Sequence, residues 1–487
     1  MADLLLEIGA EEIPAGFVAQ ALADLKPMMA EALTRARLPH GEIETFGTPR
    51  RLAVRVKDVA ALQADETREV TGPPARAAFD AIGAPTKAGL GFAKTHNVEP
   101  SALLRIQTAK GEYVGVRIHE VGRAAGEVLA SVLPELCAKL PFQKSMRWGR
   151  EKTRFARPVH WLVGLFGTEL VPFEFAGVQS GRHTHGHRFH APEALSLASP
   201  AHYEEALRGV DVVVSPRERR EEIVRELARV GAERGGTPVY DEALLDEVAY
   251  LVEKPFAIAV EFPLPYLDVP KQVLLTVMRK QQRYFAYEAA PGGALVNHFA
   301  FIANTRVREP RIVAEGALKV TRARFDDALF YLREDQKKRL SERVEGLRGI
   351  VFMRGLGTLH DKVDRIEALA LTLAADVAPA CIGDVAAAAR LCKSDLTTGI
   401  VREFPELQGY VGREYARREG LPNAVAEAIY EHYRPKGASD GAPEGAVGAV
   451  LSLADVLPGG RQGTDAVQGK LHACPTSSFP GGGNPRR

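Results

Sequence analysis

The sequence changes character abruptly at Pro458, and this change limits the part of the chain that can fold. Residues 458–487 contain 4 Pro and 7 Gly in 30 positions, with no periodic spacing of apolar residues. A segment of this composition cannot bury enough apolar surface to offset the entropy lost on ordering the chain. The sequence therefore predicts a disordered tail at 458–487 and folded domains within residues 1–457, which is length for about three domains.

Residues 1–175 combine strand and helix patterns. The short apolar segment LLLEIG and the alternating LAVRV predict strands, and PVHWLVGLFG predicts a buried strand. Between them, residues 17–38 and 124–140 carry apolar residues at helical spacing. LAVRV is expected to be half-buried, because its apolar and polar residues alternate. We therefore predict an N-terminal α+β region over residues 1–175.

Two stretches are strongly basic, although the whole chain has a net charge of only +1. The loop KSMRWGREKTRFAR holds six Lys or Arg residues together with Trp148. Residues 279–343 hold 14 Lys or Arg against 8 Asp or Glu, with Tyr and Phe interleaved. Basic groups neutralise phosphates and aromatic rings stack on bases, so 279–343 is a candidate nucleic-acid contact. A solvated helix surface above core aromatics is the structural alternative.

The central region, residues 176–345, also contains SGRHTHGHRFH, with four histidines in eight positions. On a strand His183, His185 and His187 would share one face and could ligate zinc. Arg182 and Arg188 flank the run, and no carboxylate or cysteine lies within it, so a structural or RNA-facing basic strand is favoured over a metal site. Phe189 is expected to anchor the segment in the core, and His187 to be a hydrogen-bonded part of the fold. A charged helix follows, which Ser215 caps and Gly235-Gly236 ends.

Residues 346–457 are rich in Ala and Leu and are predicted to be all-helical. His360-Asp361, His432 and Asp455 occur in the order typical of an HD phosphohydrolase domain, which needs a central His-Asp pair to hold its metal. The helix expected to carry that pair has Cys392-Lys393 instead, and a lysine ammonium replaces metal charge rather than binding metal. We therefore predict a degenerate, non-catalytic HD-like domain. A metal-dependent hydrolase is the minor alternative.

The sequence offers no nucleotide-binding motif. There is no GxxxxGK[ST] loop, GLGFAK is not a GxGxxG element, and HExxH is absent. The four cysteines (Cys137, Cys381, Cys392, Cys474) are far apart and form no CxxC pair, as fits a reducing, cytoplasmic setting. Any ATP used by this system is expected to bind another chain.

Several stretches together resemble one known family, the β subunit of the bacterial heterotetrameric glycyl-tRNA synthetase. They run in order over roughly residues 1–457 and include LLLEIGAEEIPAGF, FGTPRRLAVRV, KSMRWG, FARPVHWLVGL, GHRFH, KQVLLTVMRKQQRYFAY and LCKSDLTTGIVREFPELQGYVGREYA. The resemblance implies an α2β2 enzyme that joins glycine to tRNA(Gly). In it the α subunit carries the active site for glycine and for ATP with Mg, and the β subunit binds tRNA. It also strengthens the RNA interpretation of residues 279–343.

The sequence departs from the family after SLADVL, where members continue into a C-terminal anticodon-binding domain. A frameshift or gene-model error is one hypothesis for the tail, and the truncated chain alone is expected to be inactive. An RNA-binding or interaction protein without a ligase role is the other alternative. The fold expected is α+β multidomain, with mixed α/β N-terminal and central regions before the helical domain. The expected phosphate contacts, ranked by local charge density, are Arg279, Lys280, Arg283, Lys319, Arg322 and Arg324, followed by Arg147 and Arg188.

Overall fold

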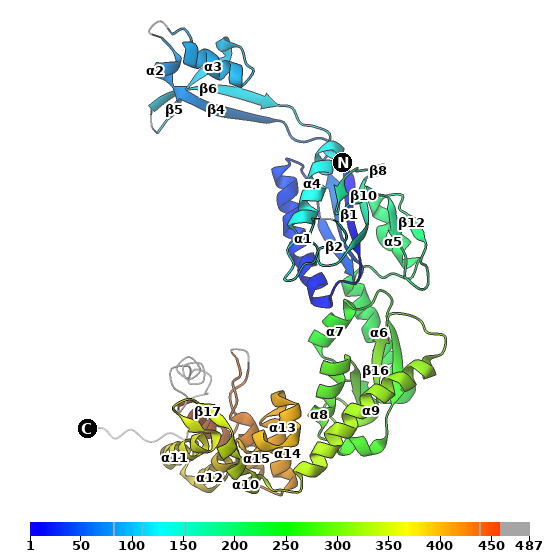
Figure 1. Cartoon of the computed structure of the whole chain (residues 1–487), viewed down its shortest axis with the longest axis vertical. Coiled ribbons are helices and arrows are strands. Elements are labelled where there is room, and N and C mark those ends of the chain that lie inside the picture. The colour runs from blue at the N-terminus through cyan, green and yellow to red at the C-terminus, as the bar shows by residue number, and fades with distance from the viewer. Residues whose placement is uncertain (81–82, 110, 151, 438–439, 458–487) are drawn as a thin grey trace, which may run out of the picture. The chain divides into compact units, whose positions relative to one another are not determined.

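The computed structural model describes residues 1–80, 83–109, 111–150, 152–437 and 440–457 (Figure 1). The chain forms two compact units. Unit 1 consists of Met1–Leu227, Tyr240–Ala257 and Ile302–Arg308, and unit 2 of Ala228–Val239, Ile258–Phe301 and the chain from Glu309 onward. The predicted boundaries at 175/176 and 345/346 stay predictions, and the predicted tail 458–487 lies outside the described residues.

Unit 1 is organised around a seven-stranded sheet. Six strands run in the order β2 (Ile43–Thr48), β3 (Arg51–Val59), β1 (Ala2–Ala10), β7 (Val159–Phe166), β10 (Val178–Gly181) and β9 (Glu174–Phe175), and β8 (Glu169–Leu170) pairs with β7. The N-terminal strand β1 is central, antiparallel to both neighbours, and Leu6 lies opposite Val54 of β3 and Gly164 of β7. The predicted strands LLLEIG, LAVRV and PVHWLVGLFG are thus three adjacent strands.

Both faces of this sheet are covered. Leu4, Leu6 and Ile8 pack on one face with helices α1 (Ala15–Arg35) and α4 (Ala125–Lys139), whereas Leu5 packs on the other with the region of α5 (Tyr203–Arg208). Each buried Leu or Ile contributes about 1.5–3 kcal/mol. The half-buried prediction for LAVRV was wrong, because every residue of Arg51–Val56 is buried. The alternation of apolar and polar residues in a strand does not show whether a second layer covers the polar face, as happens here for Arg51 and Arg55.

Residues between β3 and α4 form a smaller antiparallel sheet. Its strands run in the order β4 (Glu66–Pro74), β6 (Gly111–Glu120) and β5 (Leu103–Thr108), with α2 (Ala75–Ala78), α3 (Lys87–Thr95) and the short turn η1 (Pro100–Ala102). Its surface arginines are ion-paired across the strands. Arg117, for example, lies 2.7 Å from Glu69, and Arg105 lies 3.0 Å from Glu112.

The remaining elements of unit 1 include β11 (His183–His185), β12 (Ala194–Ser196), η2 (Pro200–His202) and α7 (Glu242–Ala249). The charged helix α6 (Pro216–Arg234) begins in unit 1 and continues into unit 2. It begins and ends as predicted: the Ser215 hydroxyl accepts the Glu218 N–H at 3.4 Å, and Gly235 follows with φ +85°.

Unit 2 contains a four-stranded sheet in the order β13 (Thr237–Pro238), β15 (Phe285–Glu288), β16 (Leu295–Ala303) and β14 (Phe256–Glu261). The turn η3 (Leu264–Asp268), helix α8 (Lys271–Thr276), the π-helical turn η4 (Val277–Gln281) and helix α9 (Pro310–Asp335) accompany it. Phe325 of α9 packs edge-to-face on Phe262, with ring centroids 5.2 Å apart.

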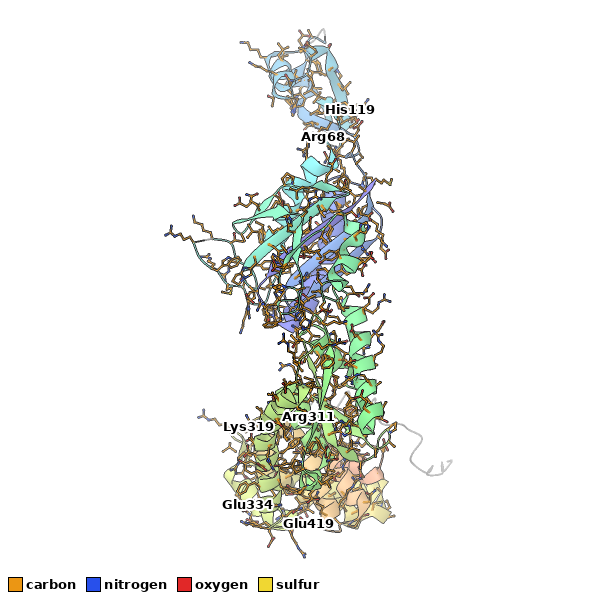
Figure 2. All side chains as sticks on the ribbon, turned by 90° about the vertical axis from the view of Figure 1, so that its right-hand side faces the viewer. Arg68, His119, Arg311, Lys319, Glu334 and Glu419 are labelled. Atoms are coloured by element: carbon orange, nitrogen blue, oxygen red, sulfur yellow. The ribbon has the colours of Figure 1, made fainter. Side chains whose placement is uncertain are left out.

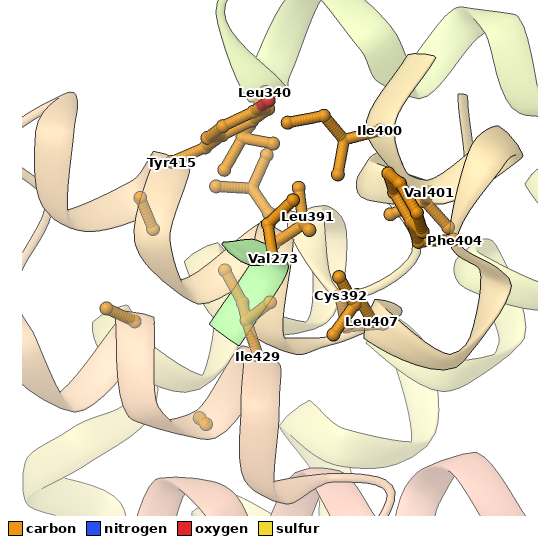
Figure 3. Close-up of a cluster of buried hydrophobic side chains, with 14 of the residues drawn as sticks. Val273, Leu340, Leu391, Cys392, Ile400, Val401, Phe404, Leu407, Tyr415 and Ile429 are labelled. Atoms are coloured by element: carbon orange, nitrogen blue, oxygen red, sulfur yellow. The ribbon is translucent and has the colours of Figure 1, made fainter. Parts of the chain in front are cut away.

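The rest of unit 2 is built mostly of helices. They are α10 (Leu340–Arg343), η5 (Val344–Gly349), α11 (Leu359–Val377), η6 (Pro379–Cys381), α12 (Ile382–Leu391), η7 (Ser394–Thr397), α13 (Gly399–Glu403), η8 (Pro405–Leu407), α14 (Tyr410–Arg418), α15 (Asn423–Glu431) and α16 (Ala446–Val456). Their core includes Leu391, Ile400, Val401 and Phe404 (Figure 3).

A short hairpin interrupts this helical region. Strands β17 (Val351–Met353) and β18 (Gly357–Thr358) pair there, because Gly355 (φ +88°) and Gly357 (φ +85°) adopt a backbone conformation that other residues rarely take. The mixed α/β, multidomain prediction is confirmed, but residues 346–457 are not purely helical. None of the helices in the described part of the chain is long and apolar enough to cross a membrane.

Candidate nucleic-acid interface

Helix α9 carries three of the eight predicted phosphate contacts, Lys319, Arg322 and Arg324. Its buried side includes Thr321, Phe325, Ala328 and Leu332, whose spacing of three and four residues defines one helix face. Away from that face, the helix exposes Arg311, Lys319, Arg322 and Arg324. Arg311 and Lys319 are marked on α9 in Figure 2. The core of unit 2 thus fixes the helix, and its basic side chains extend into solvent.

The exposed cations of α9 differ in their internal partners. Lys319 and Arg324 have no ion-pair partner among the residues that the structure describes. Arg322 interacts with the Tyr266 hydroxyl, which in turn donates a hydrogen bond to Asp326. A cation without an internal counter-charge can bind a phosphate without first breaking an ion pair. Lys319 and Arg324 are therefore the α9 residues best suited to that contact.

Three further candidates, Arg279, Lys280 and Arg283, lie at or beside η4, which contacts α9. Lys280 is ion-paired, with its ammonium 2.8 Å from the carboxylate of Glu406. Arg283 has φ +57°, which places its backbone in the left-handed region. Arg279 and Arg283 both have interactions with other residues of the chain. The structure thus brings the six candidates onto neighbouring elements of unit 2, and Glu406 is an internal counter-charge of Lys280.

The last two candidates, Arg147 and Arg188, belong to unit 1. Arg188 is paired with Glu11 and Glu12, and its hydrogen bond to Glu11 lowers the pKa of that carboxyl below its ordinary value. Arg147 is exposed on the loop between α4 and β7 and has no ion-pair partner in the described part of the chain. Of these two residues, Arg147 is the one free to bind an anion.

The histidine run is part of the fold. Its strand β11 ends at His185, and His187, whose side chain has no exposed surface, directly precedes the turn at residues 188–190. The His187 Nε2 lies 2.6 Å from the Asn304 carbonyl oxygen, so it must carry the proton and donate. The Nδ1 atom then accepts the Phe189 and His190 N–H groups at 3.3 and 3.4 Å. Burial lowers the pKa of His187, which keeps it neutral. The structural prediction for His187 is confirmed.

Phe189 does not anchor this segment. Its side chain is 72% exposed, so the prediction that it lies in the core was wrong. The anchor is instead polar, because the backbone N–H of Phe189 is bonded to the His187 ring, which is held by Asn304. An aromatic residue in a sequence pattern does not by itself distinguish a buried ring from an exposed one.

A buried ion cluster that the sequence did not reveal lies in unit 1. Arg51 is fully buried, and its guanidinium lies 3.2 Å from Glu253 and donates to the His185 carbonyl at 2.8 Å. Burial favours the neutral form of Glu253, but Arg51 holds the pKa of that carboxyl below its ordinary value. Arg51 and Glu253 are both enclosed, at 0% and 1% exposure, so the pair stabilises the fold and does not face a ligand.

Arg219 is a second buried arginine, on the helix that the sequence predicted to be charged. Its guanidinium is fully buried and donates to the carbonyl oxygens of Ala249 and Val213 at 2.7 Å each. Burial lowers its pKa to about 10, so it stays protonated at neutral pH. Because its acceptors are backbone carbonyls, no pattern of acidic residues in the sequence marks it.

A cluster of opposite charges lies inside the helical region of unit 2. Lys393, directly after α12, has its ammonium 2.9 Å from Asp455 of α16 and 2.8 Å from the His432 Nε2. The His432 Nδ1 donates to the Ile429 carbonyl, which leaves Nε2 to accept from the ammonium. Lys362 of α11 lies 2.6 Å from the other Asp455 oxygen. Two ammonium groups thus bracket one carboxylate.

The pKa shifts of this cluster follow from its burial and its charges. Burial alone would favour neutral forms, but Asp455 holds the pKa of Lys393 above its usual value, and Lys393 holds that of Asp455 well below. Burial raises the pKa of the neighbouring Cys392 thiol to about 12, so it remains a thiol. Ammonium groups cannot ligate a cation, and a protonated thiol is a poor ligand. These residues do not fit a metal centre.

His360 and Asp361, the other part of the HD pattern, lie at the start of α11, just before Lys362. With Asp364 they form the one group of convergent metal-ligand types found in the described residues. Asp361 accepts from Thr358 in a capping box, and Asp364 is 2.8 Å from Arg390. Helix capping and ion pairing therefore account for both carboxylates. Lys362 is the α11 residue that contacts Asp455, and the sequence did not identify it as part of the cluster. Its position two residues after His360 is the only sequence feature that could have pointed to it.

Comparison with known proteins matches the chain to one family. The family model described as glycyl-tRNA synthetase beta subunit covers residues 4–458. A glycine–tRNA ligase beta subunit of Trichlorobacter lovleyi is 48% identical over 455 residues, which is 93% of this chain and 66% of that protein. The Geobacter metallireducens protein of the same name is 46% identical, over 94% of this chain and 66% of its own length. The Anaeromyxobacter dehalogenans protein is 47% identical, over 94% and 65%. The chain therefore spans about two thirds of the length of these curated relatives.

Proposed function

Because the chain belongs to the glycyl-tRNA synthetase beta subunit family, we propose that it is the tRNA-binding subunit of a glycine–tRNA ligase. The observation that carries this proposal is the 48% identity to a glycine–tRNA ligase beta subunit over 93% of the chain. Its substrate would be tRNA(Gly), and its partner a catalytic α subunit in an α2β2 complex. That subunit would bind glycine and ATP with Mg, in the cytoplasm, and this chain alone would be inactive.

The role proposed for the chain is to hold the tRNA backbone so that the 3′ end reaches the active site of the partner. The candidate phosphate contacts are the eight arginines and lysines named from the sequence. Lys319, Arg324 and Arg147 rank first among them, because they are exposed and have no internal ion pair in the described structure. Lys280 and Arg188 rank lower, because binding a phosphate there would compete with Glu406 and Glu11.

We also propose that residues 346–457 form a degenerate HD-like domain without hydrolase activity. The ion cluster of Lys362, Lys393 and Asp455 supports this, since ammonium groups stand beside the carboxylate that would otherwise hold metal. In this interpretation the lysines supply fixed positive charge that ties α11, α12 and α16 together.

Reconstitution tests the proposed function. The purified chain, the α subunit from the same genome and a mixture of the two would each be assayed for ATP-dependent glycylation of tRNA(Gly). We expect charging in the mixture well above either subunit alone, together with salt-sensitive binding of tRNA by this chain. A mixture no more active than the α subunit, with a chain that does not bind tRNA, would refute the proposal. The assay would be repeated with a full-length relative as the positive control.

A further inference from the structure

A basic arm at sequence positions 143–157, of which the structure describes 143–150 and 152–157, connects α4 to β7 in unit 1. Met146 and Phe155 pair across it as an antiparallel bridge, with N–H to carbonyl distances of 2.8 and 3.2 Å. Gly149, with φ +56°, lies within the turn at its far end. The arm is therefore a short hairpin with a paired base.

The base of this arm is held by apolar contacts to the core of unit 1. Phe155 is 1% exposed, and its ring packs edge-to-face against Phe142 at 4.8 Å. Trp148 is partly buried and packs against the same core. The aromatic residues of the arm thus serve as its anchor, and the indole is not presented to solvent as a stacking platform.

The charged residues of the arm are almost all cationic. Its sequence contains six Lys or Arg and one acidic residue, Glu151. Five of the cations are exposed: Lys144, Arg147, Arg150, Lys152 and Arg154. Arg154 donates to the Ser145 hydroxyl at 3.0 Å, but none of the five has a carboxylate partner among the described residues.

This charge density contrasts with the other arginine-rich surface of unit 1. On the sheet β4-β6-β5, Arg68, Arg105 and Arg117 are each within 3.0 Å of a glutamate of the same sheet. Like charges that lack counter-charges repel one another and do not stabilise a hairpin. An anchored arm that keeps five exposed cations together is suited to a polyanion.

We propose that the basic arm binds the phosphate backbone of the tRNA, an inference that rests on the proposed function. An acidic protein surface fits the arm less well. Specific protein interfaces are built on an apolar centre with charges at the rim, whereas the exposed apolar surface of the arm is chiefly Met146, at 40%. Guanidinium and ammonium groups bind phosphate oxygens without reading bases, so the arm contributes affinity and position and not sequence recognition.

The test compares two triple variants of equal charge change in the full chain. The arm variant is Arg147→Gln, Arg150→Gln and Lys152→Gln, and the matched control is Arg68→Gln, Arg105→Gln and Arg117→Gln. Filter binding of a tRNA(Gly) transcript is measured over a range of salt concentrations, and thermal unfolding of each variant is checked. Because all six residues are exposed, we expect every variant to unfold near the wild-type temperature.

We expect the arm variant to lose about tenfold or more in affinity near 0.1 M salt. The slope of log affinity against log salt should become shallower by about 2 to 3, at roughly 0.7–0.9 per lost phosphate contact. The control should change the slope by less than about 1. A transcript of unrelated sequence should respond to the arm variant in the same way, since the contacts are to the backbone.

Three results would overturn the proposal, and they are distinguishable. If the wild-type chain binds tRNA and the arm variant keeps its slope and affinity, the arm does not contact RNA although the proposed function stands. If RNA binding is unchanged and association with the α subunit is lost, the arm is a protein contact. If the wild-type chain shows no salt-dependent tRNA binding, the proposed function fails and the arm proposal with it.

Discussion

Two groups of basic residues in unit 2 differ in their surroundings: one is buried and ion-paired, and the other is exposed and unpaired in the described part of the chain. On α11 and after α12, Lys362 and Lys393 are buried, and both contact Asp455. On α9, Lys319 and Arg324 are exposed and have no ion pair in the described structure. The exposed group lies in the strongly basic stretch 279–343, and the buried group lies in the Ala- and Leu-rich stretch 346–457. What separates their roles is whether a carboxylate accompanies the cation into the core.

The difference has a simple energetic origin. A cation moved out of water without a partner costs several kcal/mol, so a buried lysine persists only beside compensating charge. An exposed cation carries no such cost, and an unpaired one adds little to folding. Buried cations in this chain should therefore control stability, and exposed unpaired cations should control anion binding. The variants below test that division, and two of them extend it to the buried carboxylate Asp395 and to the ion-paired surface cation Lys280.

The largest effect is expected from Asp455→Ala. It leaves the buried Lys362 and Lys393 ammonium groups without their carboxylate, which should destabilise the helical region by about 3–5 kcal/mol. Chemical denaturation followed by circular dichroism measures the loss. The triple variant Lys362→Met, Lys393→Met and Asp455→Leu should recover most of it, because all three buried charges of this ion cluster are removed together. Wild-type stability in Asp455→Ala would contradict the structural role of the cluster.

The second-largest effect is expected from Asp395, whose titration should make the stability of the fold depend on pH. Burial raises its pKa to about 6, although N–H groups of Gly409 and Gly412 bond its carboxylate and partly oppose the shift. The folded chain then holds a proton that the unfolded chain has released between about pH 4 and 6, so stability falls as the pH rises through that window. The loss should be about 2–3 kcal/mol.

Asp395→Asn isolates this contribution, since it removes the titrating group and keeps an oxygen to accept the Gly409 N–H. Denaturation midpoints of wild type and variant would be compared at intervals from pH 4 to 7. We expect the two stability curves to converge at low pH and separate as the pH rises, with the variant flatter. Parallel curves would show that Asp395 does not titrate in this window.

A smaller free-energy change, in binding and not in folding, is expected from Lys319→Glu with Arg324→Glu. Reversing two exposed charges on α9 should weaken tRNA binding by about 10- to 30-fold, or 1–2 kcal/mol, and make its salt dependence shallower. The melting temperature should stay at the wild-type value, because neither side chain is buried or ion-paired. Arg322→Glu is a less clean variant, because Arg322 also contacts Tyr266.

The smallest effect is expected at Lys280, which is exposed but paired with Glu406. A surface ion pair contributes about 0–1 kcal/mol, so Lys280→Ala should change the unfolding free energy by less than about 1 kcal/mol. Its effect on the salt dependence of tRNA binding should be smaller than that of the α9 variant. If Lys280→Ala weakened tRNA binding as much as the α9 variant does, an ion pair within the chain would not distinguish residues that contact RNA from those that do not.

The sequence predicted the helices and strands better than it predicted which side chains contact one another in the fold. The strands around LLLEIG and the helix between Ser215 and Gly235 were predictable, because apolar spacing and capping residues are local signals. Burial of Arg51 was not, since its counter-charge Glu253 lies 202 residues further along the chain. Arg219 is satisfied by backbone carbonyls, which no side-chain pattern encodes.

The candidate site was predictable to a similar degree. Charge density identified α9 and the neighbourhood of η4, but it could not separate Lys319 from Lys280, because the ion pair with Glu406 forms only in the fold. The sequence showed Cys392-Lys393 at the position where the proposed HD-like pattern would need a His-Asp pair. The contribution of Lys362 was not, because it depends on which turn of α11 faces Asp455.

The most direct test of this division measures both properties on two variants side by side. For Lys319→Glu with Arg324→Glu, we expect a shallower salt dependence of tRNA(Gly) binding at a wild-type melting temperature. For Asp455→Ala, we expect a lowered melting temperature and a wild-type salt dependence at temperatures where the variant is folded. A wild-type salt dependence in the α9 variant, measured with a wild-type chain that binds tRNA, would contradict the assignment of these cations to RNA.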